Sequence, residues 1–222
     1  MSSTKSTPPR QIGWFKRLFY HVLRYMARVV GVLFFELRCY GRENLPSGSA
    51  LVLSTHQSHF DPVLVGLLFN DRLNYLARRT LFNNKLFAGL IRLLDAIELD
   101  RDRSGLAGLK ETLKRLKAEE KVLIFPEGTR TTDGKISPLK PGFLAVARRS
   151  QALLVPVTVT GAYEVLPRGV KLPIRYPIRI QIGQPVKFCD YEHLSDDQTL
   201  QLLALRLQTG YRSIQRLRAE HF

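Results

Sequence analysis

The sequence is poor in cysteine, and this excludes two kinds of protein. Only Cys39 and Cys189 occur among its 222 residues, and they lie far apart in the chain. Two such residues provide neither the ligand spacing of a zinc site nor the framework of a disulfide-stabilised domain. We therefore interpret both as structural thiols in a protein of a reducing compartment.

Long apolar runs are also missing. No window of about 18 residues is free of charge, which disfavours a simple transmembrane helix. The N-terminus has no compact apolar segment followed by a small-residue cleavage site, so we expect no secretory signal and a protein that stays inside the cell. The most apolar region is interrupted by Arg24, Arg28, Glu36 and Arg38.

Acidic residues are scarce relative to basic ones. The chain has 34 Lys and Arg against 19 Asp and Glu, a net charge of +15, within an ordinary globular composition of 45% hydrophobic residues. Such a charge predicts a negatively charged partner: nucleic acid, an anionic membrane surface or a phosphorylated substrate. Nucleic-acid binding ranks last, because the cations are not interleaved with aromatic residues along a stripe.

The N-terminal part divides into two segments. Residues 1–10 are polar and contain Pro8 and Pro9, which predicts a disordered lead-in. Residues 11–38 are predicted to be a membrane-associating segment, in which residues 12–35 form a basic amphipathic helix. We expect it to lie in a membrane interface with its basic side toward anionic headgroups; alternatively, it packs on its own domain with that side in solvent. The basic side carries Lys16, Arg17, His21, Arg24 and Arg28, and the apolar side Phe15, Leu18, Phe19, Val22, Met26, Val29 and Leu33.

The remaining residues, 39–222, alternate between strand and helix patterns. We predict strands at 51–53, 73–77, 97–99, 122–125, 153–159 and 178–182, and helices at 62–69, 81–94, 106–120, 139–149 and 196–218. This alternation predicts an α/β fold, a mixed and largely parallel sheet covered by helices. Functional sites in such folds gather at the ends of strands.

One candidate site follows the strand at 51–53. His56 and Asp61 lie in the turn before the next helix. An imidazole can accept a proton from an attacking hydroxyl, and a carboxylate on its other nitrogen fixes the tautomer and stabilises the imidazolium. Two other interpretations stay open: Asp61 before Pro62 as a helix N-cap, and a metal site that also includes His59.

A second group of polar residues lies near the ends of later strands. The run 125–130 reads Phe-Pro-Glu-Gly-Thr-Arg, in which Glu127 can accept a substrate hydroxyl and Arg130 can bind a phosphate through paired N–H donors. Arg101 and Lys140 also lie near strand ends. Each of these residues alone could be a solvated surface charge, but together the three cations can converge on one phosphate-sized anion.

Taken in order, these runs resemble the glycerolipid acyltransferase family, which makes phosphatidic acid from lysophosphatidic acid. The family's His-x4-Asp block corresponds to residues 56–61, a block ending in Asp-Arg to residues 97–101, Phe-Pro-Glu-Gly-Thr-Arg to residues 125–130, and Val-Pro-Val to residues 155–157. Four blocks in order are a far more specific signal than any one of them. Residues 39–222 are thus expected to be an acyltransferase domain.

The resemblance implies roles for individual residues. His56 would be the general base and Asp61 its orienting partner, and Glu127, Gly128 and Thr129 would shape the acceptor pocket. Arg101, Arg130 and Lys140 would hold the acceptor's phosphate.

The resemblance also implies the reactants and the location. The donor would be acyl-coenzyme A or acyl-carrier protein, and neither a metal nor an organic cofactor is expected. The acceptor would be 1-acyl-glycerol-3-phosphate, at the cytoplasmic face of the cell membrane. Another lysophospholipid or a lyso-ornithine lipid stays open, because Thr55 stands where family members often carry Asn and His59 occupies a varied position.

Overall fold

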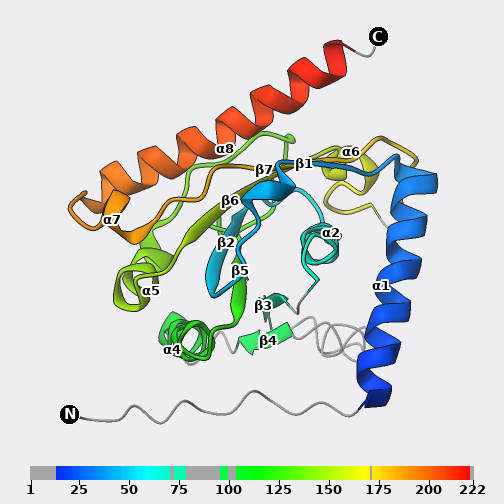
Figure 1. Cartoon of the computed structure of the whole chain (residues 1–222). Helices are drawn as coiled ribbons and strands as arrows, with labels where there is room; N and C mark the ends of the chain where they lie inside the picture. Colours follow the sequence, from blue (N-terminus) through cyan, green and yellow to red (C-terminus); the bar gives the residue numbers. More distant parts are fainter. Residues whose placement is uncertain (1–13, 71–72, 79–95, 100–103, 171, 221–222) are drawn as a thin grey trace.

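The structure is a computed structural model that describes residues 14–70, 73–78, 96–99, 104–170 and 172–220 (Figure 1). In this part of the chain seven strands form one sheet in the order β1-β7-β6-β2-β5-β3-β4. All neighbours are parallel except β6 and β7. The predicted α/β fold with a mixed, largely parallel sheet is therefore confirmed. The strands are β1 (Arg38–Tyr40), β2 (Ala50–Ser54), β3 (Leu73–Arg78), β4 (Ala96–Leu99), β5 (Lys121–Ile124), β6 (Leu154–Thr160) and β7 (Arg179–Ile182).

Helices cover both faces of this sheet (Figure 1). The predicted helix at 81–94 and the predicted lead-in at 1–10 lie outside the described residues. The helix predicted at 139–149 begins later, as a 3-10 turn at η3 followed by α5, where Pro141 and Gly142 open the turn. The helices are α1 (Trp14–Phe35), η1 (Arg42–Asn44), α2 (Asp61–Gly66), α4 (Ser104–Lys117), η3 (Pro141–Phe143), α5 (Leu144–Ser150), α6 (Ala162–Val165), α7 (Phe188–Tyr191) and α8 (Asp196–Ala219).

β2 lies at the centre of the sheet and divides the core into two. All five of its residues are buried, as expected for a strand with parallel neighbours and helices on both faces. Val52 packs with α2 on one face, while Leu51 and Leu53 pack with α5 and α8 on the other. Because its side chains alternate between the two faces of the sheet, β2 is packed on both sides. This packing holds the start of the His56 turn, which follows β2.

α1 stands beside the domain with α2 between it and the sheet (Figure 1). The predicted helix is present, but its orientation differs from both expectations. Arg24 donates hydrogen bonds to the backbone and side-chain oxygens of Asn70 at 2.8 and 3.2 Å, and Arg28 donates to Leu67 O at 2.6 Å. These carbonyls follow the end of α2, where backbone acceptors lack helical partners. The prediction that Arg24 and Arg28 face headgroups or solvent is therefore wrong.

The apolar side of α1 is the exposed side. No described helix is long and apolar enough to cross a membrane. α1 nevertheless presents a row of large apolar side chains outward, which a helix packed only against its own domain would turn inward. The exposed residues are Val22, Tyr25, Met26, Val30, Val32, Leu33 and Phe34.

Candidate active site

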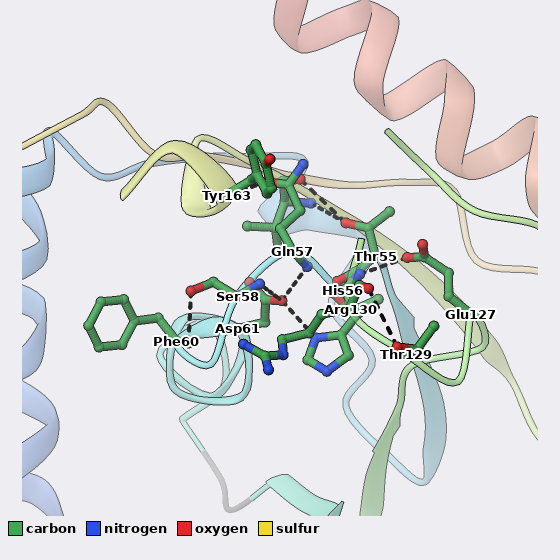
Figure 2. A network of polar contacts seen from close by, with 12 residues as sticks. Thr55, His56, Gln57, Ser58, Phe60, Asp61, Glu127, Thr129, Arg130 and Tyr163 are labelled. Atoms are coloured by element: carbon green, nitrogen blue, oxygen red, sulfur yellow. Dashed lines mark hydrogen bonds and ion pairs between the residues drawn. The ribbon is translucent and has the colours of Figure 1, made fainter. Parts of the chain in front are cut away.

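Two neighbouring parallel strands bring the two main sequence motifs together. Leu53 in β2 pairs with Ile124 in β5, so both strands end at the same edge of the sheet. The turn that carries His56 and Asp61 follows β2, and the loop that carries Glu127 follows β5. Figure 2 shows the two loops meeting through a network of hydrogen bonds.

His56 and Asp61 form a hydrogen-bonded pair. The distance from His56 Nδ1 to Asp61 Oδ2 is 2.9 Å, and the same oxygen accepts the backbone N–H groups of Gln57 at 2.6 Å and Ser58 at 2.7 Å. Asp61 is fully buried and is the first residue of α2, whose N-cap, Phe60, makes no side-chain cap. The alternative of Asp61 as a simple N-cap is therefore wrong, since its carboxylate binds the turn and the imidazole.

This arrangement determines which imidazole nitrogen is available. Asp61 Oδ2 already accepts two N–H groups, so we assign the proton of the neutral ring to Nδ1, which donates to that oxygen. Nε2 then keeps its lone pair and can accept a proton. The ring is stacked on Phe125 with centroids 3.9 Å apart, and the His56 side chain is 19% exposed. A reacting hydroxyl can therefore approach a fixed base.

The burial of Asp61 has an electrostatic consequence. Desolvation raises the pKa of Asp61 above its ordinary value, against the opposing effect of the bonds from His56, Ser58 and Gln57. Its second oxygen, Oδ1, is buried and has no hydrogen-bond partner in the described part of the chain. The hydrogen bonds from His56, Gln57 and Ser58 therefore all act on one oxygen of a carboxylate that burial disfavours in its charged form.

Glu127 links the loop after β5 to the His56 turn. Its Oε1 accepts His56 N at 2.7 Å and its Oε2 accepts Ser137 N at 2.8 Å. The side chain is buried, and desolvation raises its pKa against the lowering effect of those bonds. Both carboxylate oxygens of Glu127 therefore already bind backbone groups, one of them at the candidate base itself.

Further contacts hold the same turn and were not expected from the sequence. Thr131 N donates to His56 O at 2.8 Å. Gln57 donates from Nε2 to Gly134 O at 3.0 Å and accepts Tyr163 N at 3.3 Å. The partners of the turn come from two separate segments, the loop after β5 and α6. Their only signal in the sequence is that they lie close to a motif.

Thr55 has a structural explanation. Its hydroxyl donates to Val159 O at 3.3 Å and accepts Val159 N at 2.9 Å. The side chain thus joins the end of β2 to β6, just past the last residue pair of the two strands. A residue type that departs from the family pattern therefore supports the sheet edge from which His56 projects.

Of the three cations predicted to bind a phosphate, two lie in the described part of the chain. Arg130 lies near His59, since its charge contributes, after desolvation, to lowering the pKa of His59. The chain of Lys140 lies over Gly128, because a Cβ added at Gly128 would be 3.1 Å from Lys140 Nζ. Gly128 has a φ of +71°, which favours glycine. Arg101 lies outside the described residues.

Thr129 completes the predicted set and is exposed at the tip of the same loop. As for a metal, no group of three or more His, Cys, Asp or Glu side chains within the described ranges is arranged to hold one. His56 and Asp61, which would have to contribute, are bonded to each other.

The fold and the site together define an α/β protein with a hydrogen-bonded histidine and aspartate pair at the end of a largely parallel sheet. Residues 36–160 match the family model described as "Acyltransferase", and the chain belongs to the acyltransferase family. It is 32% identical over 166 residues to a 1-acyl-sn-glycerol-3-phosphate acyltransferase of Bacillus subtilis, a match that covers 74% of this chain and 80% of that protein.

More distant relatives extend the comparison. A chloroplastic 1-acyl-sn-glycerol-3-phosphate acyltransferase of Arabidopsis thaliana is 27% identical over 78% of this chain, which spans only 50% of that protein. The crystal structure of the 1-acyl-sn-glycerophosphate acyltransferase of Thermotoga maritima superposes with a TM-score of 0.76 at 25% identity. That superposition covers 92% of this chain and 81% of the other.

Proposed function

We propose that this protein is a 1-acyl-sn-glycerol-3-phosphate acyltransferase of phospholipid biosynthesis. It moves a fatty acyl group from acyl-coenzyme A or acyl-carrier protein to the sn-2 hydroxyl of 1-acyl-glycerol-3-phosphate, and the product is phosphatidic acid. The relatives at 25 to 32% identity carry this name. The observation that carries the proposal is the 2.9 Å bond between His56 Nδ1 and the buried Asp61, which leaves Nε2 free for the hydroxyl.

The proton transfers of the proposed reaction need only His56 and Asp61. As the acceptor oxygen attacks the thioester carbonyl carbon, His56 Nε2 takes the hydroxyl proton, and Asp61 stabilises the imidazolium. The tetrahedral intermediate collapses, the C–S bond breaks, and the departing sulfur takes up the proton from Nε2. The products are the new ester and a free thiol. The transfer is direct, because neither cysteine belongs to a motif and the Ser58 hydroxyl is buried and donates to Leu166 O.

The surrounding residues have supporting roles in this proposal. Arg130 and Lys140, with Arg101, neutralise the acceptor's phosphate. Gly128 allows the backbone turn over which Lys140 lies, and Thr129 contacts the acceptor from the loop tip. Glu127 contributes to the acceptor site by holding the His56 turn and the segment at Ser137 in register.

The acceptor is a lipid, so the enzyme must work at a bilayer. We infer that α1 places it there, with the exposed apolar side of the helix among the acyl chains. The protein is then peripheral or monotopic at the cytoplasmic face of the cell membrane, and its positive charge favours anionic lipids.

An acceptor panel tests the proposal. One labelled acyl-coenzyme A is offered with 1-acyl-glycerol-3-phosphate, with lysophospholipids whose phosphate is a diester, and with a lyso-ornithine lipid. We expect the phosphate monoester to react fastest and Arg130→Gln to raise its KM about tenfold, since a charged hydrogen bond is lost. Arg149→Gln, at an exposed position in α5, is the charge-matched control. Preference for the lyso-ornithine lipid would refute the phosphate role.

A further inference from the structure

The loop of residues 166–177, between α6 and β7, exposes apolar side chains that the proposed reaction does not use. Val170 is 48% exposed, Ile174 59% and Leu172 77%, the highest value among the exposed large apolar residues of the described chain. Isolated apolar side chains on a surface need no explanation, but three within five residues form a cluster.

The loop is held in this exposed position by its own backbone. Val170 N donates to Pro167 O at 3.3 Å and Ile174 N donates to Val165 O at 2.9 Å. Pro167, Pro173 and Pro177 further restrict the chain. These three exposed side chains, called the apolar tip below, therefore belong to a loop that backbone hydrogen bonds hold in place.

Basic residues flank the apolar tip. Arg168 is exposed on one side of it. Arg175 lies on the other, 72% exposed, and its guanidinium is 3.8 Å from Glu36, too far for a strong ion pair. Lys171 follows Val170 in the sequence, so apolar and basic residues are mixed in this loop. Such a mixture suits a bilayer surface, in which acyl chains lie beneath anionic headgroups.

The loop continues the apolar surface of α1. Ile178 N donates to Phe35 O at 2.8 Å, so the end of the loop is bonded to the last residue of α1. Figure 1 shows the loop at the C-terminal end of that helix, where Val32, Leu33 and Phe34 are exposed. At its other end Leu166 O accepts the Ser58 hydroxyl at 3.1 Å. The loop thus connects the surface of α1 with the turn that carries His56.

We propose that this loop is a second membrane-inserting element, in which Val170, Leu172 and Ile174 enter a lipid bilayer beside α1 while Arg168 and Arg175 bind anionic headgroups. Two contacts at different places fix the tilt of the domain, which a single helix would leave free to roll. The proposal rests on the proposed function only in that the substrate is a lipid; the insertion itself can be measured without turnover.

Fluorescence measures the insertion directly. The chain has a single tryptophan, Trp14, so Trp14→Phe with Leu172→Trp places one probe in the loop. We expect a blue-shifted emission with vesicles of phosphatidylethanolamine and phosphatidylglycerol, and quenching by lipids brominated on their acyl chains. Leu205→Trp, at an exposed leucine of α8, is the matched probe that should be neither shifted nor quenched. If the indole introduced by Leu172→Trp stays unquenched on vesicle-bound protein, the proposal is overturned.

A charge introduced in the loop is the second test. Leu172→Asp should lower the vesicle partition coefficient about tenfold, because burial of one leucine in an apolar phase is lost, whereas Leu205→Asp should leave it unchanged. Equal partition of both variants contradicts the proposal. The proposal is also contradicted if the wild-type protein is a dimer in solution and Leu172→Asp alone is a monomer, which would assign the surface to a second copy of the chain. The acceptor panel is run in parallel: a protein that is inactive on every lysolipid, but whose loop probe is quenched, refutes the proposed function and leaves the insertion standing.

Discussion

The two oxygens of the Asp61 carboxylate are in opposite situations. Oδ2 accepts three hydrogen bonds, whereas Oδ1 is buried without a partner in the described residues. Burial raises the pKa of Asp61, so its ionised form is held at a cost in folding free energy. In the proposed mechanism the rest of the fold offsets this cost, and a negative charge therefore stays beside the imidazolium.

Asp61→Asn separates the catalytic effect of the Asp61 charge from its cost in folding free energy. We expect kcat to fall about 10²- to 10⁴-fold, because the imidazolium loses its counter-charge, while the free energy of unfolding at neutral pH rises by about 1 kcal/mol. Between the ordinary pKa of Asp and its raised value in the fold, the folded state binds more protons than the unfolded state. Wild-type stability therefore falls as pH rises through that window, and the variant lacks this loss.

Urea unfolding of wild type and variant over a pH series measures this difference. Glu127→Gln is the matched control, since both Glu127 oxygens accept backbone N–H groups and a new NH₂ would face one of them. It should be destabilised by about 1–3 kcal/mol. An Asp61→Asn protein that is less stable than wild type at neutral pH would show that the carboxylate is structural.

The sequence predicts the residues proposed for the chemistry better than it predicts the residues that hold them in place. His56 and Asp61 follow a buried strand, and the structure brings them into contact. Thr131, by contrast, holds the His56 turn through its backbone N–H group, which every residue except proline has. Side-chain type therefore gives no information about such contacts.

At the scale of elements, α1 is held to the domain by arginine hydrogen bonds. Arg28→Gln removes the guanidinium that donates to Leu67 O. We expect α1 to be released locally, with amide hydrogen exchange in α1 faster by about tenfold or more, since a charged hydrogen bond to a buried acceptor is lost.

Arg149→Gln is again the control, with the same change in net charge at an exposed site. If exchange in α1 is the same in both variants, the hydrogen bonds seen at Leu67 and Asn70 do not hold the helix.

The sequence pattern predicts some helices and strands better than others. Strand β2 and helix α8 follow from apolar runs and from helical periodicity. β1 was missed because Arg-Cys-Tyr is short and carries a charge, and it lies at the edge of the sheet. The amphipathicity of α1 was predicted correctly, but the side that faces the domain was not, because carbonyls at the end of α2 provide partners that no property of α1 itself reveals.

At the scale of the whole molecule, the net charge of +15 leads to a prediction that distinguishes an anionic membrane from nucleic acid as the partner. Binding to vesicles with phosphatidylglycerol should weaken as salt rises from low to about 0.5 M, as screening shortens the Debye length, but should not vanish, because apolar side chains of α1 remain inserted. Sedimentation of the protein with vesicles measures this.

Duplex DNA is the competing ligand in the same salt series. Binding to DNA that exceeds binding to vesicles at every salt concentration would favour a nucleic-acid-binding protein and contradict the membrane assignment.

The arrangement of the site is a property of the whole sheet. The sequence predicts that polar residues follow several strands. It does not predict that β5 pairs directly with β2, because β3 and β4 come between these two strands in the chain. That pairing brings Glu127 to His56 N. Strand order depends on how the crossovers pack, a long-range property that a local pattern does not contain.

The central claim is that His56 is the general base, and His56→Ala tests it most directly. Acyl transfer to 1-acyl-glycerol-3-phosphate is measured for this variant, with His193→Ala at an exposed histidine as the control. We predict that His56→Ala loses about 10²- to 10⁴-fold in kcat while its unfolding curve and vesicle binding stay close to wild type, and that His193→Ala stays fully active. Near wild-type turnover by a folded, membrane-bound His56→Ala protein would contradict the account.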